Sequence, residues 1–135
     1  MIVIPAEGGA QPLAVIGNQN TTPASLTFAE LKGIMRADQQ RFGNGQKIVL
    51  AVMKVSTPTG NSVVERVLEM SADAFRKHWL AVIFQGKATP PKQFDTEEAL
   101  RVFVATTEGA IGILPSSSVT GEGISQISVD GKKTW

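Results

Sequence analysis

Three apolar stretches of this chain are each followed by a segment rich in Ser, Thr, Asn and Gly. The apolar stretches cover 12–16, 48–53 and 110–114, and the polar segments cover 17–22, 54–61 and 115–118. Hydroxyl and amide side chains donate and accept hydrogen bonds without carrying charge, so they suit recognition of a polar solute better than catalysis. Ligands of an open α/β sheet bind outside the carboxyl ends of the strands. We therefore expect the three segments to form one recognition edge.

The segment 54–61 is the best candidate for an anion site. Thr57 followed by Pro58 is typical of a helix start, and the amides and dipole of a helix N-terminus attract oxyanions such as phosphate or sulfate. Pro58 removes one of these amide donors, and simple capping by Thr57 explains the pattern equally well. The candidate ligand-binding residues are Ser56, Thr57, Thr59, Gly60, Asn61 and Lys54, with Asn20 and Thr21 from the first polar segment and Ser116 and Ser117 from the third.

The first and third polar segments each have a simpler interpretation. Residues 17–22 suit a polar connection to the first helix, and residues 116–118 suit a solvated loop. Either interpretation would remove those residues from a binding site.

Catalysis has little support in this sequence. The single histidine, His78, lies in a predicted amphipathic helix beside Arg76 and Lys77, where a surface or packing role is favoured over that of a general base. Glu97 and Glu98 open a helix, where they stabilise its dipole. The glycine-containing segments match neither the phosphate loop nor the dinucleotide fingerprint. We expect no enzyme activity, no catalytic residues, no metal site and no cofactor.

Composition favours an ordinary soluble domain. The chain has 135 residues, a formal net charge of +1 and no cysteine, with 42% apolar and 19% charged residues. This length predicts one domain, and the balanced charge gives no field for nucleic acid or an acidic membrane. The start lacks the basic and long apolar regions of a signal peptide, and no apolar run is long enough to cross a membrane. We expect a soluble chain from which a leader could already have been removed.

The elements that would position the site alternate between strand and helix. A capping box at Thr27 predicts a first helix, Thr57 a second, Ser71 a third and the acidic segment 95–98 a fourth. The continuous apolar run 48–53 predicts a strand buried on both faces, and 124–129 alternates as an edge strand does. Residues 86–93 predict a surface loop. In the third helix Phe75, Trp79 and Ile83 form an apolar stripe that belongs in the core.

The order of these parts resembles the phosphate-binding proteins of bacterial ABC transporters. The resemblance spans roughly residues 12–131, and no single piece of it is specific. It rests on several pieces in the family's order and spacing, which are the stretches 25–35, 42–45, 48–53, 70–79, 83–86, 90–91 and 109–112.

This resemblance implies one lobe of a periplasmic-binding-protein-like fold, similar to compact members that lack most of the partner lobe. Full-length members close two lobes around phosphate, which an Arg, an Asp and a Ser-Gly-Thr run hold. The corresponding loop here has hydroxyls at Ser56, Thr57 and Thr59 but neither the Asp nor the Arg. The resemblance also implies a periplasmic or secreted location.

We therefore predict an α/β chain with an N-terminal extension at 1–11 and a single domain at 12–131, built on a mixed, mostly parallel sheet flanked by helices. The predicted function is recognition of phosphate or a similar oxyanion. The alternative is a protein-interaction module without a tight small-molecule ligand, because a lone lobe exposes the face that its missing half would cover. Nucleic acid and membrane insertion are not expected.

Overall fold

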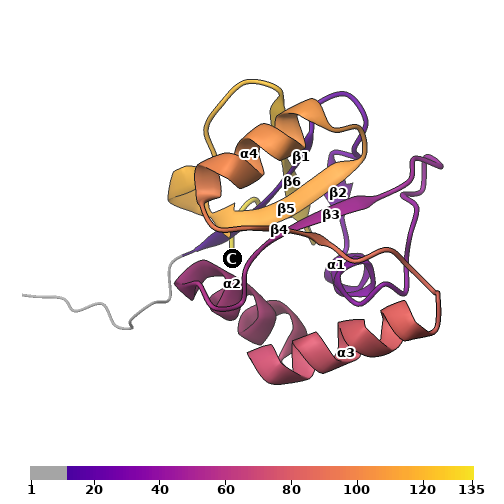
Figure 1. The fold of residues 1–135 in the computed structure, drawn as a ribbon. Helices are drawn as coiled ribbons and strands as arrows, with labels where there is room; N and C mark the ends of the chain where they lie inside the picture. Colours follow the sequence, from indigo (N-terminus) through magenta and orange to yellow (C-terminus); the bar gives the residue numbers. More distant parts are fainter. Residues whose placement is uncertain (1–11) are drawn as a thin grey trace, which may run out of the picture.

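A computed structural model describes residues 12–135, so the predicted extension at 1–11 lies outside the described residues. Figure 1 shows a sheet with helices on both faces. The strands are β1 (Leu13–Asn18), β2 (Ser25–Leu26), β3 (Val49–Met53), β4 (Lys92–Phe94), β5 (Ala110–Pro115) and β6 (Ile124–Val129). The α-helices are α1 (Phe28–Met35), α2 (Pro58–Val63), α3 (Ala72–Phe84) and α4 (Glu97–Thr106). A π-helical turn, η1 (Val64–Leu68), continues α2, and a 3₁₀ turn, η2 (Ser116–Ser118), follows β5.

The predicted fold class is confirmed: the sheet is mixed, mostly parallel and flanked by helices. Its strand order is β2-β6-β1-β5-β3-β4. The pairs β2/β6, β3/β5 and β3/β4 are parallel, whereas β1 runs antiparallel to both β5 and β6. The open edge beyond β3 is β4, which was missed because its first two residues were predicted to lie in a loop.

The direction of β1 overturns the expectation of a single recognition edge. Because β1 is antiparallel to β5, its carboxyl end lies beside the start of β5, and Gly17 pairs with Ile111. The carboxyl ends of β3 and β5 lie at the opposite edge of the sheet. The polar segment after β1 is therefore separated from the other two segments by the length of the strands.

The predicted edge position of the last strand is also wrong. β6 lies between β1 and β2, because Ser25 and Leu26 pair in parallel with Ser128 and Val129. A strand of two residues leaves no alternation in the sequence from which it could be found.

The predicted helix starts are confirmed by their caps. Thr27 forms the full capping box with Glu30, and the side chains of Thr57 and Ser71 each accept an N–H from the first turn of their helix. The fourth helix is capped in the same way by Thr96, within the predicted segment. These local hydrogen bonds satisfy backbone donors that the helix cannot satisfy itself, which is why they were visible in the sequence.

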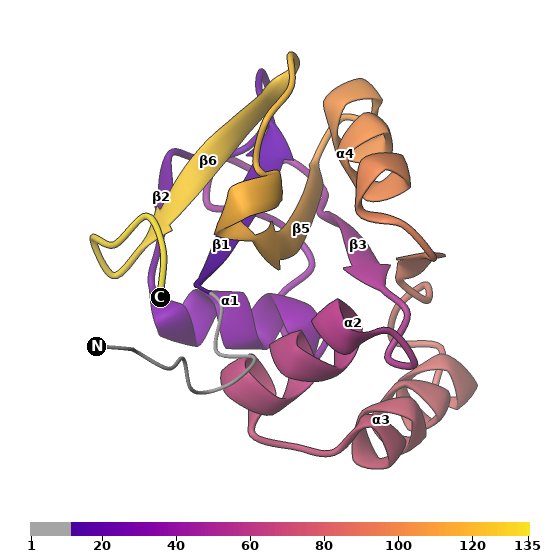
Figure 2. The ribbon, with the colours of Figure 1, turned by 90° about the vertical axis from the view of Figure 1, so that its left-hand side faces the viewer.

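Apolar side chains cover both faces of the sheet. Alternate residues of β1 and β5 face α1, α2 and η1 on one side, and the remaining residues face α4 on the other. The helix α3 forms an outer layer, where Phe75 and Trp79 pack against Val64 of η1. The prediction that Ile83 belongs to the core is wrong, because this end of α3 lies at the surface and Ile83 is 41% exposed. Figure 2 shows α3 outside α2, on the side away from the sheet.

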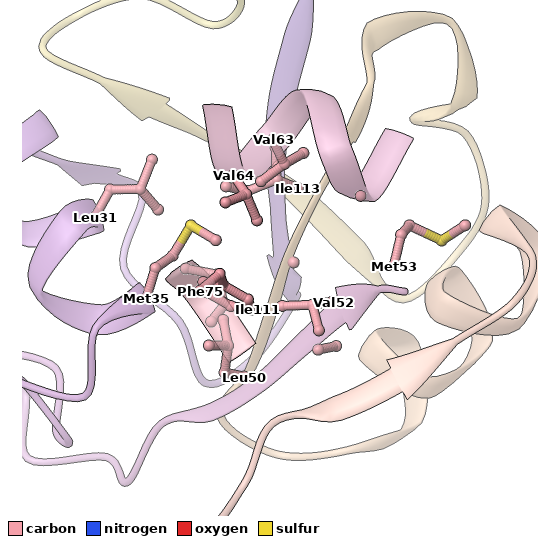
Figure 3. A pocket seen from close by; sticks show the side chains of 13 residues that line it. Leu31, Met35, Leu50, Val52, Met53, Val63, Val64, Phe75, Ile111 and Ile113 are labelled. Atoms are coloured by element: carbon pink, nitrogen blue, oxygen red, sulfur yellow. The ribbon is translucent and has the colours of Figure 1, made fainter. Parts of the chain in front are cut away.

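The space between α1, α2 and the sheet is core and has no room for a ligand. Figure 3 shows Leu31 and Met35 of α1 facing Val63, Val64 and the strand residues across this space. The gap that remains is about 10 Å³ and is lined by apolar side chains. A gap of this size scarcely holds one water molecule, and an apolar lining keeps it dry.

The packed structure continues beyond the predicted domain boundary at residue 131. The backbones of Leu13 and Trp135 exchange two hydrogen bonds, at 2.7 and 3.1 Å, and the Trp135 ring meets Phe28 edge to face. Among the residues the structure describes, no helix combines the length and apolarity needed to cross a membrane.

Candidate functional site

A hollow of about 460 Å³ opens at the carboxyl ends of β3 and β5, beside the start of α2. In Figure 2 the arrowheads of both strands point toward the layer that contains α2. The lining residues are Leu13, Met53, Thr57, Pro58, Thr59, Ser62, Asp95, Glu97 and Pro115. This is the edge at which ligands of α/β sheets bind, so it is the candidate site.

The Thr57 hydroxyl is used by the fold. It accepts the N–H of Gly60 at 3.0 Å and donates to the carbonyl oxygen of Lys54 at 2.5 Å. The proton of this hydroxyl is therefore already engaged in a hydrogen bond to the backbone. Capping of α2, one of the two interpretations of Thr57, accounts for these contacts without a ligand.

The Thr59 hydroxyl, by contrast, faces a carboxylate at the hollow. It donates to Glu97 Oε2 at 3.0 Å, and the hydroxyl of Ser118 donates to Glu97 Oε1. Glu97 thereby connects the start of α2, the start of α4 and η2. Each carboxylate oxygen has two acceptor positions, so Glu97 retains capacity for a further donor.

The charge around the hollow is negative. Within residues 12–135, Asp95 and Glu97 are the only charged residues in its lining. The ammonium of Lys54 lies 2.9 Å from Asp95 Oδ1, and the Lys54 side chain is about half exposed and that of Asp95 mostly exposed, so this pair contributes about 0–1 kcal/mol to stability. Lys54 thus offsets Asp95 and leaves the Glu97 charge uncompensated among the lining residues. An anion without a proton meets repulsion there, whereas a solute that donates a proton to Glu97 does not.

The other residues of this edge that were predicted to bind a ligand differ in their exposure to solvent. Gly60 is buried, with its backbone against the end of β3, and it contributes packing rather than a free donor. Asn61 is half-buried inside α2, and Ser56 and Ser117 are exposed. The Ser116 N–H donates to the carbonyl oxygen of Pro12 at 2.8 Å. None of these residues lines the hollow.

Asn20 and Thr21 belong to a different, structural cluster at the far edge of the sheet. The Thr21 hydroxyl donates to Asn18 Oδ1 at 2.8 Å and accepts the N–H of Gly109 at 2.7 Å. The side-chain amide of Asn18 donates to the carbonyl oxygens of Val104 and Ala105 in the last turn of α4. The interpretation of 17–22 as a polar connection therefore fits, because the segment secures the end of α4.

Sequence reasoning missed the acidic side of the site. Asp95 and Glu97 were assigned to the helix start alone, and the serine that contacts Glu97 is Ser118 rather than Ser116 or Ser117. Glu97 directly follows the N-cap Thr96. This position indicates a role at the hollow only when the start of α4 is known to lie beside α2. In the described part of the chain, no three His, Asp or Glu residues are placed to hold a metal ion.

Comparison with solved structures places this fold. It superimposes on an ABC-type phosphate transport receptor from Vibrio cholerae with a TM-score of 0.69 and 17% identity, covering 89% of this chain and 46% of that one. A protein from Clostridium perfringens described as a phosphate ABC transporter substrate-binding protein, solved with bound phosphate, superimposes with a TM-score of 0.71 and 20% identity. The match covers 90% of this chain and 46% of that one. PstS from Borrelia burgdorferi superimposes with a TM-score of 0.69 and 13% identity, and the match covers 90% of this chain and 48% of that one.

The chain has the fold of a single lobe of a phosphate-transport binding protein. This lobe spans about half the length of the solved structures that it matches. The scan against protein-family models found no match, and neither did the search of curated proteins. The similarity to the solved structures therefore lies in the path of the backbone, and sequence identities this low show a shared fold alone.

Proposed function

We propose that this binding-protein-like lobe recognises phosphate or a similar oxyanion that carries a proton, at the hollow beside α2. The observation that carries the proposal is the pairing of Thr59 and Glu97 at the hollow, which places a hydroxyl donor next to a carboxylate acceptor. A protonated oxyanion offers both acceptor oxygens and a donor O–H, so its O–H can replace the Thr59 hydroxyl as the donor to Glu97 while the Thr59 O–H turns to an oxyanion oxygen. Fold likeness to phosphate-binding proteins, one of them with bound phosphate, supports the choice of solute.

Thermal unfolding tests the proposal directly. Melting is measured at fixed pH and ionic strength with phosphate, sulfate or chloride. A ligand at 100 times its Kd stabilises the native state by about 2.7 kcal/mol, so phosphate is expected to raise the Tm above the chloride control. Absence of any rise at millimolar phosphate contradicts phosphate binding at this site.

The Thr59→Val substitution is expected to weaken phosphate binding about tenfold, because it removes the hydroxyl at the hollow and keeps the shape of the side chain. Ser56→Ala is the control, since it removes an exposed hydroxyl three residues before Thr59, at a position that does not line the hollow. Phosphate titrations followed by calorimetry compare the two. Equal losses in both variants would place the ligand outside the hollow.

The Glu97→Gln substitution is expected to reduce the preference for phosphate over sulfate about tenfold. The amide loses the negative charge that repels sulfate and offers a weaker acceptor to the phosphate proton. Glu98→Gln, the neighbouring exposed acid in the first turn of α4, is the matched control. The Kd ratio of the two anions is measured for both variants. An unchanged ratio in Glu97→Gln removes this residue from anion selection.

A second candidate function is that of a protein-interaction module, the alternative predicted from the sequence. It is favoured by apolar side chains at the surface of α3, where Leu80 is 57% and Phe84 89% exposed. Adjacent exposed apolar residues are typical of interaction surfaces.

A location outside the cytoplasm, which the resemblance implies, stays a prediction.

A further inference from the structure

Two adjoining hollows form a groove between α3 and the end of the sheet at β4. One hollow, of about 250 Å³, is lined by Val52, Phe75, Leu80, Ile83 and Gln93 among others. The second, of about 460 Å³, is lined by Leu50, Lys47, Thr89 and Lys92 among others. Trp79, Pro90 and Pro91 line both hollows, so they connect them into one depression. We call it the α3–β4 groove.

The floor of the α3–β4 groove is fixed and one wall is apolar. The indole N–H of Trp79 donates to the carbonyl oxygen of Met35 at 3.1 Å, which holds the ring in place. Leu80 and Ile83 from α3 are 57% and 41% exposed, and Phe84 at the end of the same helix is 89% exposed. Apolar side chains this exposed, gathered on one helix, leave a surface that a partner can cover.

The rim of the α3–β4 groove is positively charged. Among the residues that the structure describes, its ionisable lining residues are Lys47, Lys92 and Arg76, and no carboxylate lines either hollow. Arg76 lies 3.3 Å from Asp73, which offsets its charge. Neither Lys47 nor Lys92 takes part in an ion pair within residues 12–135. The net charge facing the groove therefore comes mainly from these two lysines and favours an acidic partner.

Among the strands of the described chain, β4 beside the groove has a neighbour on one side only. It is the last strand in the sheet order of residues 12–135 and pairs there with β3 alone. The carbonyl oxygen of Phe94 accepts the N–H of Lys54, so it points toward β3. Backbone groups of successive strand residues point to opposite sides, which directs the N–H and C=O of Gln93 to the open side. These groups can pair with an added strand.

We propose that the α3–β4 groove binds an extended peptide segment of a protein partner, with apolar side chains flanked by Asp or Glu. The segment pairs with the open side of β4 at Gln93, places its apolar side chains against Trp79 and Leu80, and places its carboxylates near Lys47 and Lys92. Addition of a strand to an open sheet edge is an established mode of peptide recognition, in which backbone bonds give affinity and pockets give specificity. The inference specifies the second candidate function, on which it rests, and is independent of phosphate binding.

Selection from a library of random nine-residue peptides displayed on phage tests the proposal, with the full chain as the immobilised target. We expect the enriched sequences to combine Val, Ile, Leu or Phe with Asp or Glu. A fluorescein-labelled copy of an enriched peptide is then titrated with the wild-type chain and its variants by fluorescence anisotropy. Raising the salt concentration is expected to weaken binding, because charged contacts at the rim are screened.

Two variants separate the components of the groove. Lys92→Glu is expected to weaken the peptide at least tenfold by reversing the rim charge. Gln93→Pro is expected to do the same by removing the outward N–H, a change that an edge strand tolerates. Lys133→Glu, an exposed lysine that lines neither hollow, is the control for net charge and is expected to keep affinity within twofold. Melting curves establish that each variant is folded.

Each result decides the proposal. Enriched acidic and apolar peptides that lose affinity in Lys92→Glu but not in Lys133→Glu support it, even if Gln93→Pro fails to fold. Peptides that bind both variants like the wild type use another surface, which overturns the groove while leaving a protein-interaction module in place. A selection that yields no binder to the full chain overturns both the groove and that module.

Discussion

Replacing Gly60 with alanine is expected to destabilise the fold by about 2–3 kcal/mol, the upper part of the range for forcing extra volume into a packed site. An added Cβ would overlap the backbone carbonyl group of Lys54 and approach the carbonyl oxygen of Met53. Both groups belong to the end of β3 and the loop that follows it, so neither can move away as a flexible side chain would. The first turn of α2 is also held in place by the bond from the Gly60 N–H to Thr57.

Chemical denaturation of Gly60→Ala measures this loss, and a Tm lower by about 10 °C is expected to accompany it. Gly43→Ala is the matched control, because a Cβ at Gly43 has no other atom within 4 Å. Its stability should stay within about 0.5 kcal/mol of the wild type. Equal stability of the two variants would contradict close contact between α2 and the end of β3, and with it the shape of the phosphate site proposed here.

Replacing Asn18 with alanine is expected to cost about 3 kcal/mol. Asn18 is 7% exposed and is the buried polar residue of the described core. Its side-chain NH2 group donates to two carbonyl oxygens in the last turn of α4, and its Oδ1 accepts hydrogen bonds from the backbone N–H of Asn20 and the Thr21 hydroxyl. Alanine removes the partner of one buried and three part-buried groups, and each group left unsatisfied costs about 1–3 kcal/mol, partly recovered through water.

Asn20→Ala provides the control for the same residue change in the same loop. Asn20 is exposed, and it contacts Asn18 through its backbone N–H, which alanine retains. Urea titrations of both variants are expected to show a large loss for Asn18 and little change for Asn20. The Asn18→Ala protein should bind phosphate normally where it remains folded, because the cluster and the hollow lie at opposite edges of the sheet. A loss of phosphate affinity in Asn20→Ala would return that residue to the binding site.

The local features of this protein could be predicted from the sequence because they depend on neighbouring residues. Helix starts at Thr27, Thr57 and Ser71 are fixed by side chains that bond within one turn of the same helix. The apolar runs of β3 and β5 and the buried Phe75 and Trp79 of α3 follow from the periodicity of each element, whereas the exposure of Ile83 does not. The order of these parts, compared with a known family, also led to the fold class that the solved structures confirm.

Tertiary structure decided which of the predicted polar segments share a site. Strand direction is not encoded in the composition of a strand, so the antiparallel β1 could not be distinguished from a parallel one, and Asn20 and Thr21 were assigned to the wrong edge. Glu97 joins the hollow only because α4, nearly forty residues after Thr59 in the chain, begins beside α2. Its dipole role at the helix start is local and visible in the sequence, whereas its contacts with Thr59 and Ser118 depend on long-range packing. Sequence determined the helix starts and the longer strands, and the packing of distant elements determined the short strands β2 and β4 and the chemistry of the site.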